Sequence, residues 1–433
     1  MKVVKFGGSS LAEASGFRKV KTIVQQDVSR LVVVVSAPGK NKIYDAKVTD
    51  LLYLLYAHIE YGIDYESILM RIKNRFISIR NELKLTFDLE SEFLHLESLL
   101  NKNISKDFLV SRGEYFQAKL MAEYLGYAFI DSKDLIVLKQ NGKVSISQTK
   151  SKLNFDVSSG VVIPGFYGSS TMNNIKLFSR GGSDLTGAIV SAYLGADEYE
   201  KWTDVSGIFA ADPNIVTSAE SIPEITFGEL REMSYRGASV LHEEVLIPLE
   251  NMSITISIKN TNDLMAVGTK IKREISQSGR YMTSVTGKQD FIALNISKRS
   301  SSDKITVLRD VLSLFINYRV NIEHIPSGID TFSVIFDASS IKDELDELLE
   351  SVNDIKNVTE VTLERNISLV AVVGRNMASI PGIAGKLFTC LGLEDINVKT
   401  IAQASTELSI IIGVENDDYE KTIRTIHKRF FEQ

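Results

Sequence analysis

The sequence predicts an α/β protein: an open, mainly parallel sheet sandwiched by helices over residues 1–260, followed by two smaller units that contain both helices and strands. Up to residue 260, short apolar runs typical of strands alternate with segments of helical character, as expected for a parallel sheet. Near the C-terminus, the succession helix, Asn-centred turn, strand, turn and strand occurs twice, around Asn321 and Asn397, which indicates an internal repeat. A chain of 433 residues is long enough for two or three domains.

The first part begins with a short apolar strand at Val3 and Val4, and we expect a helix from about Leu11. Residues 31–35 are apolar on both faces, as in a strand that is buried inside a parallel sheet. The same patterns predict further strands at residues 127–130, 161–163, 175–178, 199–202 and 253–258, and helices over most of 47–125 and at 183–193.

The second part follows residues 261–290, whose Gly, Ser, Thr and Lys content is typical of a connecting region. We place the first repeat at 291–365 and the second at 366–433. Their helices are expected at 305–317 and 383–391, and their strands at 320–325, 331–336, 396–401 and 408–414.

Composition and charge argue against several classes of protein. A net charge of −6 is unlike that of a general nucleic-acid-binding protein, which is more often basic. The only cysteine, Cys390, excludes an internal disulfide and fits a reducing compartment. The longest aliphatic run, residues 31–35, is far too short to cross a bilayer, and the N-terminus lacks the pattern of a signal peptide. We therefore expect a cytoplasmic protein without a membrane or nucleic-acid partner.

The most informative motif is Lys5-Phe6-Gly7-Gly8-Ser9-Ser10, which follows the first strand. Two glycines let a ligand approach the backbone N–H groups, and the start of a helix favours phosphate at the turn. Lys5 would add a cation to this anion site. The pattern also fits an ordinary strand–turn–helix in which a lysine protects an edge strand, and a short glycine motif does not separate the two.

A second glycine turn, at residues 179–184, lies between a predicted strand and a predicted helix. Arg180 before two glycines is suited to bind a carboxylate or phosphate group bidentately. Ser183 as an N-cap and Asp184 in the first turn would also stabilise the start of a helix. Capping explains those two residues but not Arg180 and the glycines, which favours a binding site.

Two further segments are ambiguous alone. Residues 202–213 follow a strand and end in the turn sequence Asp212-Pro213. Ser111-Arg112-Gly113-Glu114 is typical of a helix start, yet Glu114 is also suited to bind an ammonium group. The five histidines show no spacing typical of metal ligands, and no nucleophile–base grouping is evident, so no protein metal site is predicted.

Together these motifs resemble the aspartokinase family over nearly the whole chain, and their joint occurrence is far more specific than any single motif. The resemblance implies an amino-acid-kinase fold followed by two ferredoxin-like βαββαβ ACT domains. In that family the first ACT unit, here about 298–365, is inserted into the second, so a strand near 291–297 would belong with 366–433. The matching motifs are Lys5-Phe6-Gly7-Gly8-Ser9-Ser10, Ser111-Arg112-Gly113-Glu114, Arg180-Gly181-Gly182-Ser183-Asp184, Trp202-Thr203-Asp204-Val205-Ser206-Gly207, Pro381-Gly382-Ile383-Ala384-Gly385 and Asn397-Val398-Lys399-Thr400-Ile401-Ala402-Gln403.

The resemblance implies MgATP-dependent phosphorylation of the side-chain carboxylate of L-aspartate to 4-phospho-L-aspartate, the first step of lysine, threonine, methionine and diaminopimelate biosynthesis. A carboxylate with a pKa of about 4 is already ionised at neutral pH, so the reaction depends on positioning and charge neutralisation. Mg²⁺ would be held mainly by the ATP phosphates. By motif, Lys5 and Asp184 would be catalytic; Thr49, Glu114, Phe166, Arg180 and Ser183 would bind aspartate; and Lys5, Gly7, Gly8, Ser9, Thr203, Asp204 and Phe209 would bind ATP.

The chain departs from the family pattern near the predicted ATP site. Ser9 and Phe209 stand where threonine and tyrosine are common, and Asn214 stands where arginine is common. Ser239 replaces an expected lysine that faces the phosphates. A substitute cation could come from a lysine-rich loop, at Lys40, Lys42 and Lys47.

The ACT resemblance implies an amino-acid effector bound between paired units. Lysine is the first choice, because the chain resembles lysine-sensitive monofunctional aspartokinases; threonine, or both together, stays open. Pairing of ACT units across chains would cover sheet edges, which implies a homodimer or a dimer of dimers. Glu323 would receive the effector ammonium group, although a solvated surface carboxylate is an equally plain interpretation. The predicted effector residues are Asn321, Ile322, Glu323 and Ser327.

Two other functions stay open on the sequence. One is a kinase of the same fold with another acceptor, such as glutamate, acetylglutamate or a nucleotide, and the paired ACT units argue against it. The other is a non-catalytic amino-acid sensor. Ser239 is its only support, and intact Lys5 and Asp184 oppose it.

Overall fold

The chain forms two compact units in a computed structural model that describes residues 1–179, 181–237, 241–250, 252–275, 282–341, 344–375, 377, 380–403 and 408–432. Unit 1 contains residues 1–208, 221–227 and 240–276, and unit 2 contains 209–220, 228–239 and 277–433. The chain passes between the two units several times, so no single position in the sequence separates them. Most of α9 (Phe227–Tyr235) falls in unit 2, where its buried Glu229 pairs with Arg375 at 3.1 Å.

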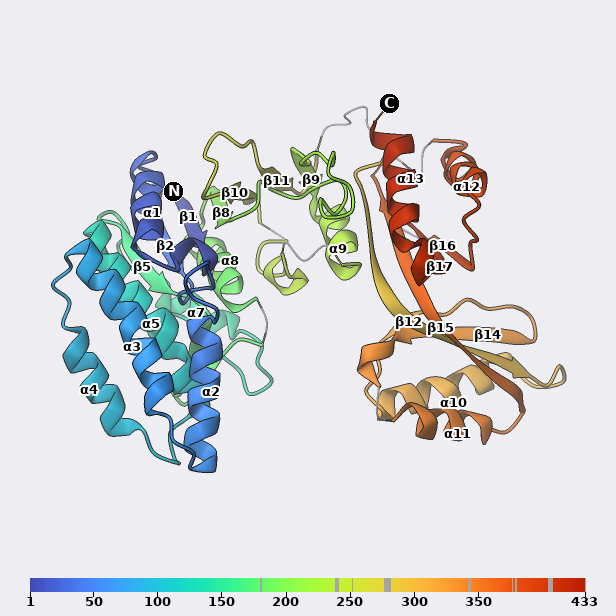
Figure 1. Cartoon of the computed structure of the whole chain (residues 1–433), viewed down its shortest axis with the longest axis horizontal. Helices are drawn as coiled ribbons and strands as arrows, with labels where there is room; N and C mark the ends of the chain where they lie inside the picture. The colour runs from blue at the N-terminus through green and yellow to red at the C-terminus, as the bar shows by residue number, and fades with distance from the viewer. Residues whose placement is uncertain are drawn as a thin grey trace. The chain divides into compact units, whose positions relative to one another are not determined.

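The main sheet of unit 1 has eight strands in the order β3-β5-β2-β1-β8-β10-β11-β9 (Figure 1). All neighbours are parallel except β10 and β11, so the predicted open, mainly parallel sheet is confirmed. β11 lies in the segment that was expected to be a connection. It was not predicted as a strand, because its four residues, TKIK, are similar in composition to a loop. The strands are β1 (Lys2–Phe6), β2 (Arg30–Val35), β3 (Ala128–Phe129), β5 (Val161–Pro164), β8 (Glu198–Thr203), β9 (Glu224–Thr226), β10 (Thr255–Asn260) and β11 (Thr269–Lys272).

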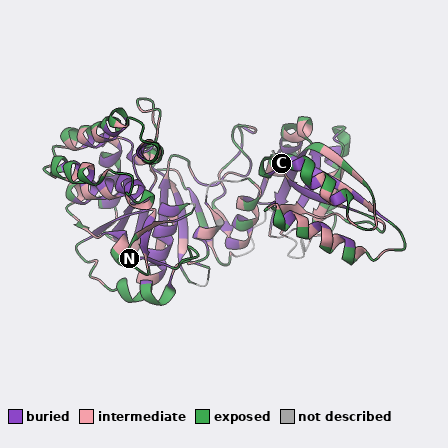
Figure 2. Ribbon diagram, turned by 90° about the horizontal axis from the view of Figure 1, so that it is seen from below, coloured by how far each residue is buried: buried purple, intermediate pink, exposed green. Residues whose placement is uncertain are grey.

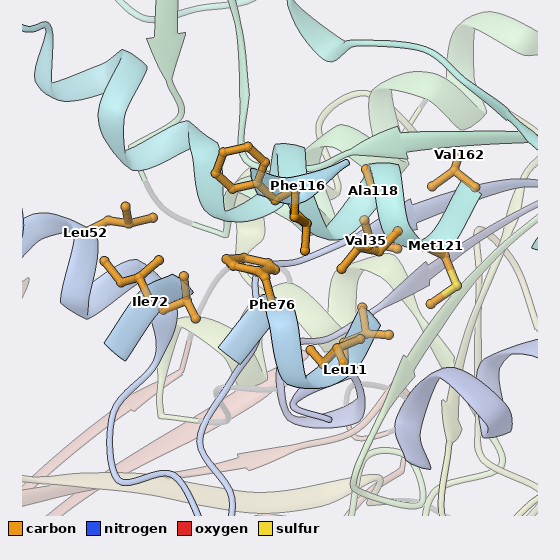
Figure 3. Packing of buried hydrophobic residues seen from close by; sticks show 14 of the residues in the cluster. Leu11, Val35, Leu52, Ile72, Phe76, Phe116, Ala118, Met121 and Val162 are labelled. Atoms are coloured by element: carbon orange, nitrogen blue, oxygen red, sulfur yellow. The ribbon is translucent and has the colours of Figure 1, made fainter. Parts of the chain in front are cut away.

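Helices cover both faces of this sheet, and its central strands are buried (Figure 2). On one face Phe6, Val35 and Trp202 join a large apolar core with the helices of residues 14–125. In that core Leu11, Phe76 and Phe116 pack around Val35 (Figure 3). The opposite face is covered by α8, which packs on β1, β2 and β8. The helices are α1 (Ala14–Gln25), α2 (Val48–Tyr61), α3 (Glu66–Leu83), α4 (Leu89–Leu99), α5 (Lys106–Leu125) and α8 (Gly182–Leu194).

Two local expectations for unit 1 differ from the structure. The helix expected from about Leu11 begins at Ala14, after the short 3-10 turn η1 (Ser9–Leu11), so the turn at Gly7 and Gly8 is not followed directly by an α-helix. The run at 175–178 pairs with an antiparallel neighbour in a separate three-stranded sheet rather than in the main sheet. The small sheet contains β4 (Val137–Leu138), β6 (Tyr167–Ser170) and β7 (Ile175–Leu177). The other short elements of unit 1 are α6 (Ser132–Leu135), α7 (Ile146–Lys152) and η2 (Glu243–Val245).

Unit 2 is built on one antiparallel sheet in the order β13-β14-β12-β15-β17-β16. Its two long strands, β12 (Ser284–Lys298) and β15 (Val358–Val373), pair along most of their length. The C-terminal half of β12, 291–297, pairs with β14 (Thr331–Asp337) of the first ACT region, and its N-terminal half, 284–288, pairs with 369–373. The strand that completes the second ACT region is therefore 284–288, not 291–297 as expected. The exposed Lys288-Gln289-Asp290 segment interrupts the apolar pattern there, so the sequence gives no sign that the strand is continuous.

Two pairs of helices give unit 2 two separate apolar cores, as expected for two ACT domains. One core lies beneath α10 and α11 and includes Phe315 and Phe336. The other lies beneath α12 and α13 and includes Leu387 and Ile426. The predicted strand at 396–401 begins only at Thr400. The elements are α10 (Lys304–Asn317), α11 (Leu345–Asn353), α12 (Ile383–Leu393), α13 (Tyr419–Phe431), β13 (Ile322–His324), β16 (Thr400–Gln403), β17 (Ser409–Glu415), η3 (Ala338–Ser340) and η4 (Asn416–Asp418).

Within the described part of the chain, no helix has both the length and the apolar character that a membrane span requires.

Candidate active site

Lys5 and Asp184, the two predicted catalytic residues, meet on the face of the main sheet that α8 covers. Lys5 lies near the carboxyl end of β1, and Asp184 lies in the first turn of α8. The Lys5 Nζ is 2.7 Å from Asp184 Oδ1, and both side chains are largely buried. The strand and the helix thus bring together two glycine motifs that are far apart in the sequence.

Lys201 is a third member of this cluster that the sequence analysis did not single out. It lies on β8, directly opposite Lys5 in the parallel register, and its Nζ is 2.8 Å from Asp184 Oδ2. No local pattern in the sequence marks Lys201, because its match with Lys5 appears only once β1 and β8 are known to be neighbours. The two aromatic rings stack on the opposite face at 6.1 Å.

Opposite charges keep the carboxylate of this cluster ionised. Burial alone would raise the pKa of Asp184, but the ammonium groups of Lys201 and Lys5 lower it to about 2. Burial lowers the pKa of Lys5, and the nearby Lys201 lowers it further, while Asp184 acts in the other direction. Asp184 is therefore an anion at any working pH and orients both ammonium groups.

Glu114 approaches the same end of the sheet from the interior of α5, not from a helix start. Its Oε1 accepts a hydrogen bond from the Ala37 N–H at 3.1 Å, just beyond β2. Among the described residues, its buried Oε2 has no hydrogen-bond partner. Burial raises the pKa of Glu114 to about 8, against the opposing effects of the Ala37 N–H and Lys5. A buried carboxylate oxygen without a partner is suited to bind a ligand ammonium group.

Gly113 in the same motif has a packing role. A Cβ atom at this position would lie 2.9 Å from Ala37 Cβ and 3.1 Å from Leu52 Cδ1. The glycine therefore allows α5 to approach α2 and the loop after β2, which places Glu114 at the site.

Phe166 and Ser183 meet at the N-terminus of α8. Phe166 adopts a positive φ of 78°, and its N–H donates to Thr186 Oγ1 at 3.1 Å. A Cβ atom at Gly165 would lie 2.6 Å from Ser183 Cβ, so close contact requires the glycine. The expectation that Ser183 is the N-cap is wrong: Gly181, with φ 58°, is the N-cap, and Ser183 is buried in the first turn. Arg180 lies outside the described residues.

Thr49 lies in the first turn of α2 and is half-buried. The start of this helix is tied to the loop after β2, because the Val48 N–H donates to Pro38 O at 3.0 Å. Thr49 is thereby placed beside the same loop that contacts Glu114.

The glycine turn after β1 is built by contact between two loops. The Gly7 N–H donates to Trp202 O at 3.1 Å, so it is occupied within the protein, whereas the N–H groups of Gly8 and Ser9 have no partner among the described residues. The Gly39 N–H donates to Gly8 O at 2.8 Å, and a Cβ at Gly39 would lie 2.5 Å from Gly8 C. Gly8, Ser9 and Lys5 are therefore the groups of this turn that are suited to bind phosphate.

The predicted nucleotide loop joins this turn through Thr261, a residue that the sequence analysis missed. The Thr261 N–H donates to Thr203 O at 2.8 Å, and its Oγ1 is 2.9 Å from Ser10 Oγ. Thr203 Oγ1 in turn donates to Asp204 Oδ1 at 3.1 Å. Phe209 belongs to unit 2, where it packs against an apolar core.

Arg75 holds the loop that supports the glycine turn. Its guanidinium donates to Gly39 O at 2.5 Å and to Ala12 O and Ala46 O at 3.3 Å, and it stacks on Tyr44 at 3.6 Å. Arg75 is buried and forms no ion pair with any carboxylate in the described ranges. The guanidinium instead donates hydrogen bonds to backbone carbonyl groups, and these bonds hold Gly39 in place against Gly8.

Replacing Arg75 by Met should therefore loosen the glycine turn. We expect the variant to lose about 2–3 kcal/mol of stability, a fall of roughly 4–10 °C in Tm, because three carbonyl groups lose a charged donor. The KM for ATP should rise about tenfold. Thermal unfolding and steady-state kinetics measure these changes. Arg71→Met, on the same helix but exposed and paired with Asp45 at 2.7 Å, is the control and should change neither value. An unaltered ATP KM in Arg75→Met would contradict this role.

The remaining residues named from the sequence are three lysines of one loop, Asn214 and Ser239. Lys40, Lys42 and Lys47 are exposed, Asn214 is an exposed loop residue, and Ser239 lies outside the described residues. In the ranges that the structure describes, no group of three or more His, Cys, Asp or Glu residues is arranged to hold a metal ion.

The predicted effector residues lie on and beside β13, the edge strand of the sheet in unit 2. Glu323 is half-buried, and burial raises its pKa, while the cations Arg236 and Lys288 act in the other direction. Ile322 is half-buried as well, and Asn321 and Ser327 are exposed. Glu323 is thus not a simple solvated carboxylate, and cations of its own chain already surround it.

Comparison with known proteins places the fold and the site in context. Residues 1–260 match the amino acid kinase family, and residues 370–430 match an ACT domain. The chain is 32 % identical to aspartokinase 3 of Bacillus subtilis over 100 % of this chain and 99 % of that protein. It superposes on the aspartate kinase of Clostridium acetobutylicum with a TM-score of 0.93 and 39 % identity, covering 99 % and 100 % of the two chains. E. coli aspartokinase III, solved with aspartate and ADP, shares the fold at 24 % identity and a TM-score of 0.81 over the full length of both chains.

The two family matches define the class of protein: a kinase of the amino acid kinase family that also contains ACT domains. Within that class, the chain belongs to the aspartokinase family. The resemblance, the fold class and the aspartate kinase activity predicted from the sequence are thereby confirmed.

Proposed function

We propose that unit 1 transfers the γ-phosphoryl group of MgATP to the β-carboxylate of L-aspartate at the carboxyl ends of β1, β2 and β8, beginning the pathway to lysine, threonine, methionine and diaminopimelate. The observation that carries this proposal is the buried cluster in which Lys5 pairs with Asp184 at 2.7 Å. Glu114, with a buried oxygen that lacks a partner among the described residues, lies close enough for its charge to influence Lys5.

No general base is needed in this reaction. The β-carboxylate of aspartate is ionised at neutral pH, with a pKa of about 4, so its oxygen can attack phosphorus without losing a proton. The P–O bond to that oxygen forms as the bond to the β,γ-bridging oxygen breaks, and ADP leaves. Lys5 stabilises the charge on the transferred group, and Asp184 holds Lys5 in place.

Among the described residues, the groups suited to bind ATP are backbone N–H groups and a lysine ammonium group, not carboxylates. The N–H groups of Gly8 and Ser9 and the ammonium of Lys5 would bind phosphate oxygens, and Thr203 and Asp204 would contact the nucleotide. Mg²⁺ would be held by the ATP phosphates and would neutralise part of their charge. Phe209 in unit 2 remains a predicted nucleotide contact.

Aspartate would be oriented by groups from three helices. Glu114 of α5 would bind the α-ammonium group, and Ser183 of α8 a carboxylate oxygen. Thr49 of α2 and Phe166 would border the pocket, and Arg180 stays a predicted carboxylate ligand.

The pKa of Glu114 gives aspartate binding a defined pH dependence. Below its pKa of about 8 this carboxyl group is mostly protonated in the free enzyme, and it must release that proton to bind an ammonium group. The KM for aspartate should therefore fall about tenfold per pH unit between pH 6 and 8 and then level off. Glu114→Gln should raise the KM about 100-fold and abolish this dependence.

Steady-state kinetics from pH 6 to 9 measure the effect. Glu123→Gln, on the same helix but with its carboxylate bound to Thr86 and Phe87 at the surface, is the matched control. A Glu114→Gln variant with the parent's KM and pH profile would remove Glu114 from the aspartate site.

A single assay tests the proposed reaction. Purified protein is incubated with MgATP, L-aspartate and hydroxylamine, which traps an acyl phosphate as its hydroxamate. Aspartyl hydroxamate supports the proposal. Signal only with another acceptor, or amino-acid binding without turnover, would overturn it in favour of a different kinase or a sensor.

We also propose regulation by an amino acid bound at the ACT domains of unit 2, with lysine as first choice and threonine as the alternative. E. coli aspartokinase III, which shares the fold, has been solved with lysine and aspartate. The edge strand β13 suits pairing of ACT units in a homodimer or dimer of dimers. A cytoplasmic location is expected. Inhibition by millimolar lysine but not by alanine, and a dimer or tetramer by light scattering, are the expected results. A monomer unaffected by lysine and threonine would contradict this part.

A further inference from the structure

Lys201 places a second ammonium group beside Lys5. In a parallel pair of strands, residues at matching register point to the same face, and Lys5 lies opposite Lys201. Phe6 and Trp202, one position later, point to the other face and enter the large apolar core. The sheet therefore directs both lysines toward the N-terminus of α8 and keeps their aromatic neighbours away from it.

One carboxylate holds both lysines. Asp184 Oδ1 is 2.7 Å from Lys5 Nζ, and Asp184 Oδ2 is 2.8 Å from Lys201 Nζ. The side chains are only 7 %, 13 % and 11 % exposed for Lys5, Asp184 and Lys201. With both lysines protonated, these three side chains carry a charge of +1. Burying them in one cluster is costly unless each group contributes to binding or structure.

The reaction proposed for this site needs more than one cation. The transferred group has three non-bridging oxygens, and charge spreads over them and onto the leaving oxygen as the bond to phosphorus breaks. An ammonium group has three donors, which is more than one ion pair with Asp184 requires, so such a group can contact several acceptors at once. A Cβ at Gly7 would lie 3.9 Å from Lys5 Nζ, so this ammonium lies at the edge of the glycine turn.

We infer that Lys201 binds the phosphoryl group during its transfer, together with Lys5, and that Asp184 holds the two ammonium groups for this purpose. The inference rests on the proposed function, because it requires the reaction to occur at this end of the sheet. It also gives this chain a second cation at the phosphoryl group from a buried strand position rather than from the exposed Lys40, Lys42 and Lys47. The bond changes are those given above, and no proton moves.

The first test is the turnover of Lys201→Met, which keeps the length of the side chain and removes its charge. We expect kcat to fall about 100-fold, as for loss of one charge-stabilising donor, with the aspartate KM within threefold of the parent. Lys259→Met is the matched control. Lys259 lies on the next strand, β10, and pairs with Glu200 at 2.7 Å on the other face of the sheet, so its kcat should stay within threefold.

A second measurement separates phosphoryl binding from a structural role. Binding of ADP and of a non-hydrolysable ATP analogue with an imido bridge is compared by calorimetry in the presence of Mg²⁺. Lys201→Met should weaken the analogue about tenfold relative to ADP, and Lys201→Arg should restore most of the difference. A residue that only supported Asp184 would change both affinities equally or neither.

Lys5→Met distinguishes failure of this inference from failure of the proposed function. If Lys5→Met loses turnover while folded Lys201→Met keeps kcat within threefold, or changes both affinities equally, the role of Lys201 is wrong and the site stands. If both variants keep full turnover, the proposed site itself is wrong. Circular dichroism and thermal unfolding show whether each variant is folded. If Lys201→Met does not fold, kcat is compared between Lys201→Arg and Lys201→Gln instead. Equal kcat values in these two variants would also overturn the inference.

Discussion

Lys5→Met is expected to lower kcat about 1000-fold while the protein stays folded and the aspartate KM changes little. In the proposed reaction the largely buried ammonium of Lys5 would stabilise the charge that develops during phosphoryl transfer, and loss of one such donor costs about 10²–10³ in rate. The upper end applies because Lys5 also borders the glycine turn, where Gly8 and Ser9 would hold the phosphates.

The measurement is ADP release coupled to a spectroscopic assay, with the hydroxamate assay as a check on the product. Lys2→Met is the control on the same strand: Lys2 pairs with Asp27 at 3.0 Å and Glu198 at 2.9 Å, away from Asp184. Turnover of Lys5→Met within tenfold of the parent would refute the catalytic assignment.

Asp184→Asn should have an effect of similar size on kcat, and it should also destabilise the protein. The variant keeps the shape of the side chain but removes the anion between two buried ammonium groups, and breaking a buried pair in this way costs about 3–5 kcal/mol. Turnover should fall about 10²–10³-fold, because Lys5 and Lys201 then repel each other without a common partner.

The pH dependence of stability supplies an independent check. The folded-state pKa of Asp184, about 2, lies below the ordinary value of 3.8, so its stabilisation is present above about pH 4 and is lost as the pH falls toward 2. The difference in free energy of unfolding between the parent and Asp184→Asn should be constant near neutral pH and shrink below pH 4. Asp197→Asn, an exposed carboxylate that pairs with the N-terminus, is the control with little expected effect. Equal stability of parent and Asp184→Asn at pH 7 would contradict the buried-charge argument.

Most of the fold could be predicted from the sequence because unit 1 alternates clear apolar strands with helices. The strand at residues 31–35 is apolar on both faces and occupies an inner position in the sheet, as such a pattern requires. The failures have local causes. The strand at 284–288 was not predicted, because a charged segment separates it from 291–298. The division into units was not predicted either, because the chain crosses from one unit to the other several times and no local pattern marks these crossings.

Part of the site could be predicted, because it is built from tight turns. Such turns require particular residue types, which are visible in the sequence as motifs. Glycine turns at Gly7 and Gly182 and the acidic residue Asp184 are visible as motifs, and the structure brings Lys5 and Asp184 together. Lys201 and Thr261 could not be found in this way, because their roles depend on which strands are neighbours. Strand order is a property of the whole sheet, and a single sequence does not state it.

The continuous strands β12 and β15 also constrain how the C-terminal region assembles. Residues 284–288 must find 369–373 across the whole inserted segment, and closing so long a loop carries an entropic cost. Pairing of 291–298 with 358–367 within the inserted segment brings those distant ends side by side in the correct alignment. The inserted domain should therefore fold first. Its paired strands would then hold 284–288 next to 369–373, so that the second ACT domain can form by extending a pairing that already exists.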